Sequence, residues 1–218
     1  MKVELIAHTA DAAKLCGQAA AECTASDNYE SALKNAVGSG HTSVLEHAVF
    51  TFKVEGLSRA ALAQLTRHRL ASFDVRSQRY VKLTDWKAVV PASIAGSAFA
   101  DEAEGCLRGC MDLYQRMVDA GVPAEDARYI TPQAITTDLV MTMNARELGH
   151  FFTLRTCNRA QWEIRELADE MLRICRRIAP EIFGQCGPGC VRGICPEKRP
   201  CGKPREKGEW DERKDQTV

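Results

Sequence analysis

A stretch near the middle of the chain, QLTRHRLASFDVRSQRYVKL at residues 64–83, concentrates side chains that bind anions. Its four arginines are Arg67, Arg69, Arg76 and Arg79. A guanidinium stays charged at any working pH and donates two parallel hydrogen bonds to a phosphate or a carboxylate. Asp74 is the only carboxylate in the stretch, so the arginines would repel one another without a further anion. The stretch therefore predicts an anionic ligand.

Ordinary surface ion pairs are the competing interpretation of these arginines, because such runs commonly lie on solvated faces. Phe73 and Tyr80 indicate partial packing of the stretch, which weakens that interpretation. The sequence has no G-x-G-x-x-G fingerprint after a strand and no Walker loop. We therefore expect side chains, rather than a glycine-rich loop, to hold any phosphate.

The elements before and within the stretch follow from hydrophobic periodicity and capping residues. Residues 3–8 predict a strand, a helix begins near Asp11, and a second helix over 26–40 is capped by Ser26 or Asp27. Residues 48–54 alternate as a half-buried strand that Gly56 ends. A helix from Ser58 through 69 would place three polar side chains on one face, after which residues 79–83 return to an extended pattern. Those three side chains are Gln64, Arg67 and His68.

The second half of the chain alternates between helical and extended patterns. A long helix is predicted over 97–121, a short helix after Pro123, a strand over 136–143 and a helix from Asn144. The strongest amphipathic pattern covers 160–180. This order of elements indicates an α/β or mixed α+β domain, with a central sheet flanked by helices.

Length and composition point to one domain. The chain has 218 residues with 45% hydrophobic content, and its 29 lysines and arginines equal its 29 aspartates and glutamates. Bulk charge therefore suggests neither nucleic acid nor an anionic membrane as a partner. We expect no membrane span or signal peptide, and hence a cytoplasmic location.

Four of the ten cysteines lie in a tail rich in glycine, proline and charge, residues 184–218. They are Cys186, Cys190, Cys195 and Cys201. Their spacing permits a structural zinc site, oxidative bridging or unligated thiols, and the last of these is the favoured interpretation. The segment EKGEWDERKDQTV at 206–218 is expected to be disordered.

The segment RHRLASFDVRSQRY resembles the signature of the flavin-dependent thymidylate synthases, R-H-R followed by seven residues and a serine. Three further segments are similar to that family in the same order: GHTSVLEHAVFTFKVEG, EDARYITPQA and NARELGHFFTLRTCNRAQWEIRELA. The resemblance covers about residues 1–183, which we take as the domain. It implies a homotetrameric enzyme that methylates dUMP to dTMP with methylenetetrahydrofolate, using FAD that NADPH reduces.

The resemblance also implies roles for individual residues. The residues expected to contact FAD are His41, Ser43, Arg67, His68, Arg69, Asn144, Arg146 and His150. The residues expected to bind dUMP are Gln64, Arg67, Ser77, Gln78, Arg79, Arg128 and Arg155, of which Arg155 is the catalytic one because it would favour the ionised uracil.

Some positions differ from residues common in the family. Asp74, Val75 and His150 do so near the expected flavin, which leaves those flavin contacts open. Two other functions remain as alternatives. One is a zinc-containing nucleic-acid-binding module built on the arginine cluster, and the other is a flavoprotein of this fold that acts on another nucleotide or lacks methyl transfer.

Overall fold

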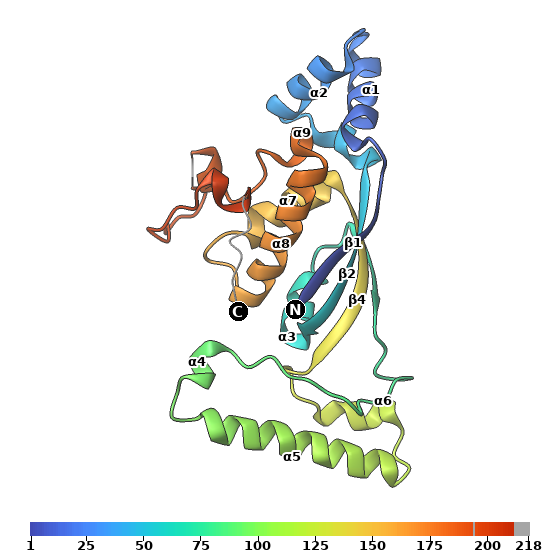
Figure 1. Cartoon of the computed structure of the whole chain (residues 1–218), viewed down its shortest axis with the longest axis vertical. Coiled ribbons are helices and arrows are strands. Elements are labelled where there is room, and N and C mark those ends of the chain that lie inside the picture. The colour runs from blue at the N-terminus through green and yellow to red at the C-terminus, as the bar shows by residue number, and fades with distance from the viewer. Residues whose placement is uncertain (194, 212–218) are drawn as a thin grey trace. The chain divides into compact units, whose positions relative to one another are not determined.

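A four-stranded sheet organises the computed structural model, which describes residues 1–193 and 195–211 (Figure 1). The strands are β1 (Lys2–His8), β2 (Val49–Ser58), β3 (Ala71–Val75) and β4 (Thr136–Asn144). They form an open antiparallel sheet in the order β1-β2-β4-β3. Burial alternates residue by residue along β4, as expected for a strand with one face covered. The predicted mixture of helices and sheet is confirmed.

The chain divides into two compact units, and each of the four strands contributes residues to both. Unit 1 comprises residues 1–2, 54–66 and 74–139. Its helices are α3 (Arg59–Leu65), α4 (Ala92–Ala95), α5 (Ala100–Asp119), α6 (Ala124–Ala127) and the 3-10 helix η2 (Arg128–Ile130). Its core forms where Met111 and Tyr114 of α5 pack with Ile135.

Unit 2 comprises residues 3–53, 67–73 and 140 onward. Its α-helices are α1 (Ala12–Thr24), α2 (Tyr29–Gly38), α7 (Ala145–Arg155), α8 (Trp162–Ile178) and α9 (Pro180–Phe183). The 3-10 helices are η1 (Thr42–His47), η3 (Gly189–Arg192) and η4 (Lys207–Trp210). α8 buries the predicted apolar stripe, and α7 packs against it. Phe50, Phe152 and Phe183 join β2, α7 and α9 through edge-on ring contacts.

The secondary structure of the arginine-rich stretch, residues 64–83, differs from the prediction. α3 ends at Leu65 with Thr66 as its C-cap, whose N–H and hydroxyl both donate to the Leu62 carbonyl, at 3.0 and 3.1 Å. Arg67 and His68 therefore leave the helix, and the predicted shared face with Gln64 is wrong. The strand covers Ala71–Val75, where half-buried and exposed residues alternate, whereas residues 79–83 form turns and irregular structure.

Two smaller predictions are also wrong. Gly56 does not end β2 but lies within it at φ +78°, and its N–H donates to Asp138 Oδ1 at 2.9 Å. α2 is capped by Asn28, whose side chain accepts from the Ser31 N–H, rather than by Ser26 or Asp27.

Ordered structure in the tail, residues 184–218, continues further along the chain than predicted. Trp210 is 1% exposed, and the guanidinium groups of Arg176 and Arg205 each lie over its ring, 5.1 and 4.5 Å from the centroid. Asp169 of α8 accepts hydrogen bonds from the Trp210 indole at 2.8 Å and from Arg205 at 2.7 Å. The prediction of disorder is therefore wrong for residues 206–211, and residues 212–218 lie outside the described part. No helix among the described residues is both long and apolar enough to traverse a bilayer.

Candidate functional site

A cavity of about 400 Å³ lies in unit 1, lined by α3 and by residues 128–133. Three of its lining side chains are the hydrogen-bond donors Arg59, Gln78 and Arg128. Arg59 is held at the start of α3, where its N–H donates to the Ile135 carbonyl at 3.1 Å. Its guanidinium reaches the carbonyl of Arg76 at 3.2 Å. The sequence predicted Gln78 and Arg128 at such a site, but it missed Arg59.

Two donors at this cavity are buried without a hydrogen-bond partner within the described structure: Arg59 Nε and Gln78 Nε2. Burial lowers the pKa of the Arg59 guanidinium below its ordinary value, and the positive charge of Arg128 lowers it further. Buried donors without partners are costly, and two neighbouring cations repel. An anion with several acceptor oxygens would relieve both.

The other expected substrate residues of unit 1 do not line this cavity. Arg79 donates through Nε to Glu125 at 2.7 Å, and Ser77 Oγ accepts from the backbone of Arg79 at 3.1 Å, which closes a turn. Gln64 lies half-buried on α3. Arg76, for which the sequence suggested no role, forms an ion pair with Asp138 at 2.8 Å. Part of the arginine cluster therefore has protein partners.

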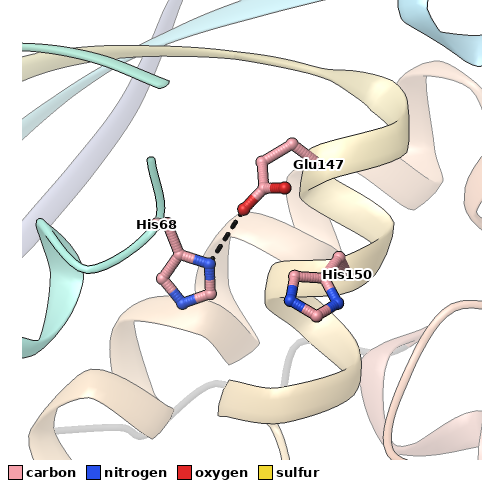
Figure 2. Close-up of side chains that lie close together, drawn as sticks. All are labelled: His68, Glu147 and His150. Atoms are coloured by element: carbon pink, nitrogen blue, oxygen red, sulfur yellow. Dashed lines mark hydrogen bonds and ion pairs between the residues drawn. The ribbon is translucent and has the colours of Figure 1, made fainter. Parts of the chain in front are cut away.

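In unit 2, a chain of hydrogen bonds links Glu147, His68 and Arg155. Glu147 Oε1 lies 2.9 Å from His68 Nδ1 (Figure 2). On the other side of the ring, Arg155 Nε donates to His68 Nε2 at 3.1 Å. His68 and Glu147 are both buried, and the His68 ring meets the edge of Phe151 with centroids 4.9 Å apart. Sequence reasoning selected His68 and Arg155 but missed Glu147.

The buried histidine is held in its neutral form. Burial lowers the pKa of His68, the hydrogen bond to Glu147 raises it in part, and the charge of Arg155 lowers it again. The ligand atoms of His68, Glu147 and His150 lie within 4.8 Å of one another, a separation at which a metal ion can be held. Both nitrogens of His68 are engaged in hydrogen bonds in this structure, so the arrangement described here is a hydrogen-bond relay.

Asn144 and Arg146 lie at the start of α7. The side chain of Asn144 caps the helix by accepting the Glu147 N–H at 2.9 Å. Arg146 pairs with Glu46 of η1, which packs against α7. The expected flavin residues of η1, His41 and Ser43, are exposed.

Exposed cationic side chains gather in the same unit. Arg67 and Arg69 flank the buried His68, and both are exposed. Burial lowers the pKa of Arg155, and the positive charge of Arg67 lowers it further. The charges of these two guanidinium groups therefore repel one another, which favours an anionic ligand beside them.

Comparison with known proteins identifies the family. The family model described as thymidylate synthase complementing protein matches residues 4–181. This chain belongs to the flavin-dependent thymidylate synthases. A flavin-dependent thymidylate synthase from Geobacter sulfurreducens is 47% identical over 222 residues, covering 94% of this chain and 96% of the relative. A relative of the same name from Sulfolobus acidocaldarius is 39% identical, covering 88% of this chain and 78% of the relative. Another from Pyrococcus furiosus is 44% identical, covering 79% of this chain and 75% of the relative.

The family match ends before the tail cysteines. Burial raises the pKa of the Cys186 thiol to about 11, whereas Cys190, Cys195 and Cys201 line a separate cavity together with Cys157. Among the described residues, no three thiols lie close enough to share a metal ion. The alternative of a zinc-containing nucleic-acid-binding module has no support from this geometry or from the flavin-dependent thymidylate synthase relatives.

Proposed function

We propose that this chain methylates carbon 5 of dUMP to form dTMP, with methylenetetrahydrofolate as the carbon donor. FAD, reduced by NADPH, supplies the hydride when it is bound. The observation that carries the proposal is the cationic cavity of unit 1, where the buried donors Arg59 Nε and Gln78 Nε2 have no hydrogen-bond partner among the described residues. The function agrees with the family to which the chain belongs.

The phosphate of dUMP is the ligand that we assign to this cavity. Arg59 and Arg128 supply positive charge, and the Gln78 amide supplies a neutral donor. Gln64, Ser77 and Arg79 remain proposed substrate contacts, and Arg79 would exchange Glu125 for the nucleotide. The mutual repulsion of Arg59 and Arg128 supports this assignment, because a phosphate dianion would cancel it.

Arg155 acts on the uracil ring in this proposal. Its guanidinium, hydrogen-bonded to the imide, favours the ionised form of the base, which makes carbon 5 electron-rich enough to attack the methylene carbon. Arg67 adds a second positive charge to the same environment. The one cysteine in the segments similar to the family is Cys157, which lines the cavity of the tail. The proposed activation by Arg155 needs no covalent bond between uracil and an enzyme thiol.

The exposed side chains of unit 2 fit the flavin dinucleotide in chemistry. Arg67, Arg69 and Arg146 are donors suited to its diphosphate. His41, Ser43, His68, Asn144 and His150 are the further proposed contacts. Asn144 contributes by its backbone if its side chain stays in the helix cap.

Assembly into a homotetramer is also part of the proposal. Large apolar side chains that subunit contacts would cover are highly exposed in the single chain, among them Leu70, Tyr80 and Tyr129. Residues 1–183 form the catalytic domain in this proposal, and residues 184–218 are an appended tail.

The test is to purify the protein, record its visible spectrum and assay dTMP formation from dUMP, methylenetetrahydrofolate and NADPH. We expect bound flavin, a spectral change on adding dUMP, and dTMP formation that requires all three substrates. A colourless protein that neither binds added FAD nor oxidises NADPH would refute the proposal.

A further inference from the structure

Glu147 has no role in the functions assigned so far, although it is one of the few buried carboxylates of unit 2. It is 7% exposed on the first turn of α7, where the Asn144 cap fixes its backbone. Burying a carboxylate is costly unless it accepts hydrogen bonds. Its side-chain partner is His68 Nδ1 at 2.9 Å.

The direction of the two hydrogen bonds fixes the position of the imidazole proton. A guanidinium only donates, so the bond of 3.1 Å from Arg155 Nε requires His68 Nε2 to be an acceptor. The ring proton must then lie on Nδ1, where it points to the carboxylate of Glu147. In a neutral imidazole, the hydrogen bond made by one nitrogen determines the state of the other. Glu147 thus selects the tautomer that Arg155 needs.

Fixing one nitrogen of Arg155 orients its whole guanidinium, because Nε, Cζ and both Nη atoms share one plane. We propose that Glu147 is a positioning residue for Arg155, acting through the tautomer of His68 to aim the guanidinium at the uracil ring. This role rests on the proposed function of Arg155. Misplacing a catalytic group by about 1 Å can cost roughly 10²-fold in rate, so an effect of that size is expected.

Protonation of His68 would break the relay. The charged and titratable groups around the ring are Glu147, Arg155 and His150, whose ring centroid lies 6.0 Å away. A proton on Nε2 would place two donors face to face at Arg155. The relay therefore predicts that activity falls as His68 becomes protonated.

Two substitutions of Glu147 separate its acceptor from its charge. Glu147→Leu fills similar space without an acceptor, whereas Glu147→Gln keeps a carbonyl oxygen that accepts from Nδ1 and loses the charge. For Glu147→Leu we expect kcat to fall roughly 10²-fold, with KM for dUMP and flavin content within about threefold of the wild type. For Glu147→Gln we expect kcat within about tenfold of the wild type, because the amide restores the tautomer.

Nitrogen-15 NMR of the histidine side chains provides a readout that does not depend on turnover. His68 should carry its proton on Nδ1 in the wild type and in Glu147→Gln, and should lose that preference in Glu147→Leu. Wild-type kcat in Glu147→Leu, or equal losses in both variants, would overturn the positioning role. If the wild type makes no dTMP, the proposed function fails, whereas the NMR result still supports or overturns the relay. If Glu147→Leu does not fold, the wild type alone still tests the positioning role of Glu147, because a proton on His68 Nε2 would overturn that role.

Discussion

The two units use arginine in opposite ways. In the cavity of unit 1, Arg59 is half-buried beside another cation, and its buried Nε has no hydrogen-bond partner within the described structure. In unit 2, Arg155 Nε is already held by His68, which Glu147 holds in turn. In the proposed function, a ligand completes the first arrangement, whereas the protein itself completes the second. We therefore propose that the cavity arginines provide affinity for dUMP, whereas the hydrogen bonds that link Glu147, His68 and Arg155 provide orientation and thus rate.

The strongest test of this contrast is Arg155→Ala. We expect kcat for dTMP formation to fall by about 10³-fold, because a preorganised charge at the reacting base is lost. Flavin content, measured by absorbance of the purified protein, should stay at the wild-type level. Loss of flavin combined with full turnover after adding FAD would contradict the role of Arg155.

Substitution in the cavity should affect binding rather than rate. Arg59→Ala is expected to raise KM for dUMP by roughly 10- to 100-fold, since hydrogen bonds to charged groups contribute about 1.5–3 kcal/mol. The value of kcat at saturating dUMP should change little. Arg76→Ala is the matched control, because this arginine is satisfied by Asp138 outside the cavity lining, and its KM should stay within about twofold. A fall in kcat for Arg59→Ala at unchanged KM would contradict the assignment of Arg59 to dUMP binding rather than to the reaction rate.

Salt concentration should change KM for dUMP more than kcat, by less than the substitutions above. Phosphate binding at an open, cationic cavity is screened by ions, so KM for dUMP should rise by a few-fold between about 0.05 M and 0.5 M potassium chloride. The rate at saturating dUMP depends on the buried relay and should change less over the same range. Steady-state kinetics at several salt concentrations measure both, and a KM independent of salt would weaken the phosphate assignment.

The smallest expected effect concerns pH and stability. The folded-state pKa of His68 is lowered by burial, so the unfolded chain binds this proton more readily than the folded chain. Stability from the neutral ring is therefore present above the ordinary histidine pKa, about 6.5, and is lost as pH falls toward the folded value. Urea unfolding of wild type and His68→Asn between about pH 7.5 and 5 should show a shallower pH dependence in the variant. Equal slopes would show that His68 does not titrate as described.

Sequence periodicity was sufficient where an element is long and one-sided. Helix α8 was predicted almost to its ends, because its apolar stripe repeats over four turns or more. β3 was missed although Ala71, Phe73 and Val75 alternate with exposed residues, since a five-residue edge strand carries a weak signal beside arginines. Trp210 was assigned to a disordered segment because charged neighbours hide a single aromatic residue whose partners on α8 lie far away in sequence.

The site was predictable where residue types form a local motif. The R-H-R segment selected His68, but its partner Glu147 lies 79 positions later, and no spacing rule joins them. Asn144 followed by Glu147 is the ordinary pattern of a helix start, which conceals the second role of that glutamate. Arg59 offered a usable signal, because a cation on the first turn of a helix opposes the helix dipole and so suggests another reason for its presence.

The contact between Arg205 and the carbonyl of Thr156 has a consequence for biosynthesis. Thr156 directly follows Arg155 and caps the carboxyl end of α7, and its oxygen accepts from Arg205 at 2.9 Å. During translation, this oxygen has no such partner until residue 205 has left the ribosome. The hydrogen bond from Arg205 to the end of the helix that carries Arg155 therefore forms only after the whole region matched by the family model, residues 4–181, has been synthesised.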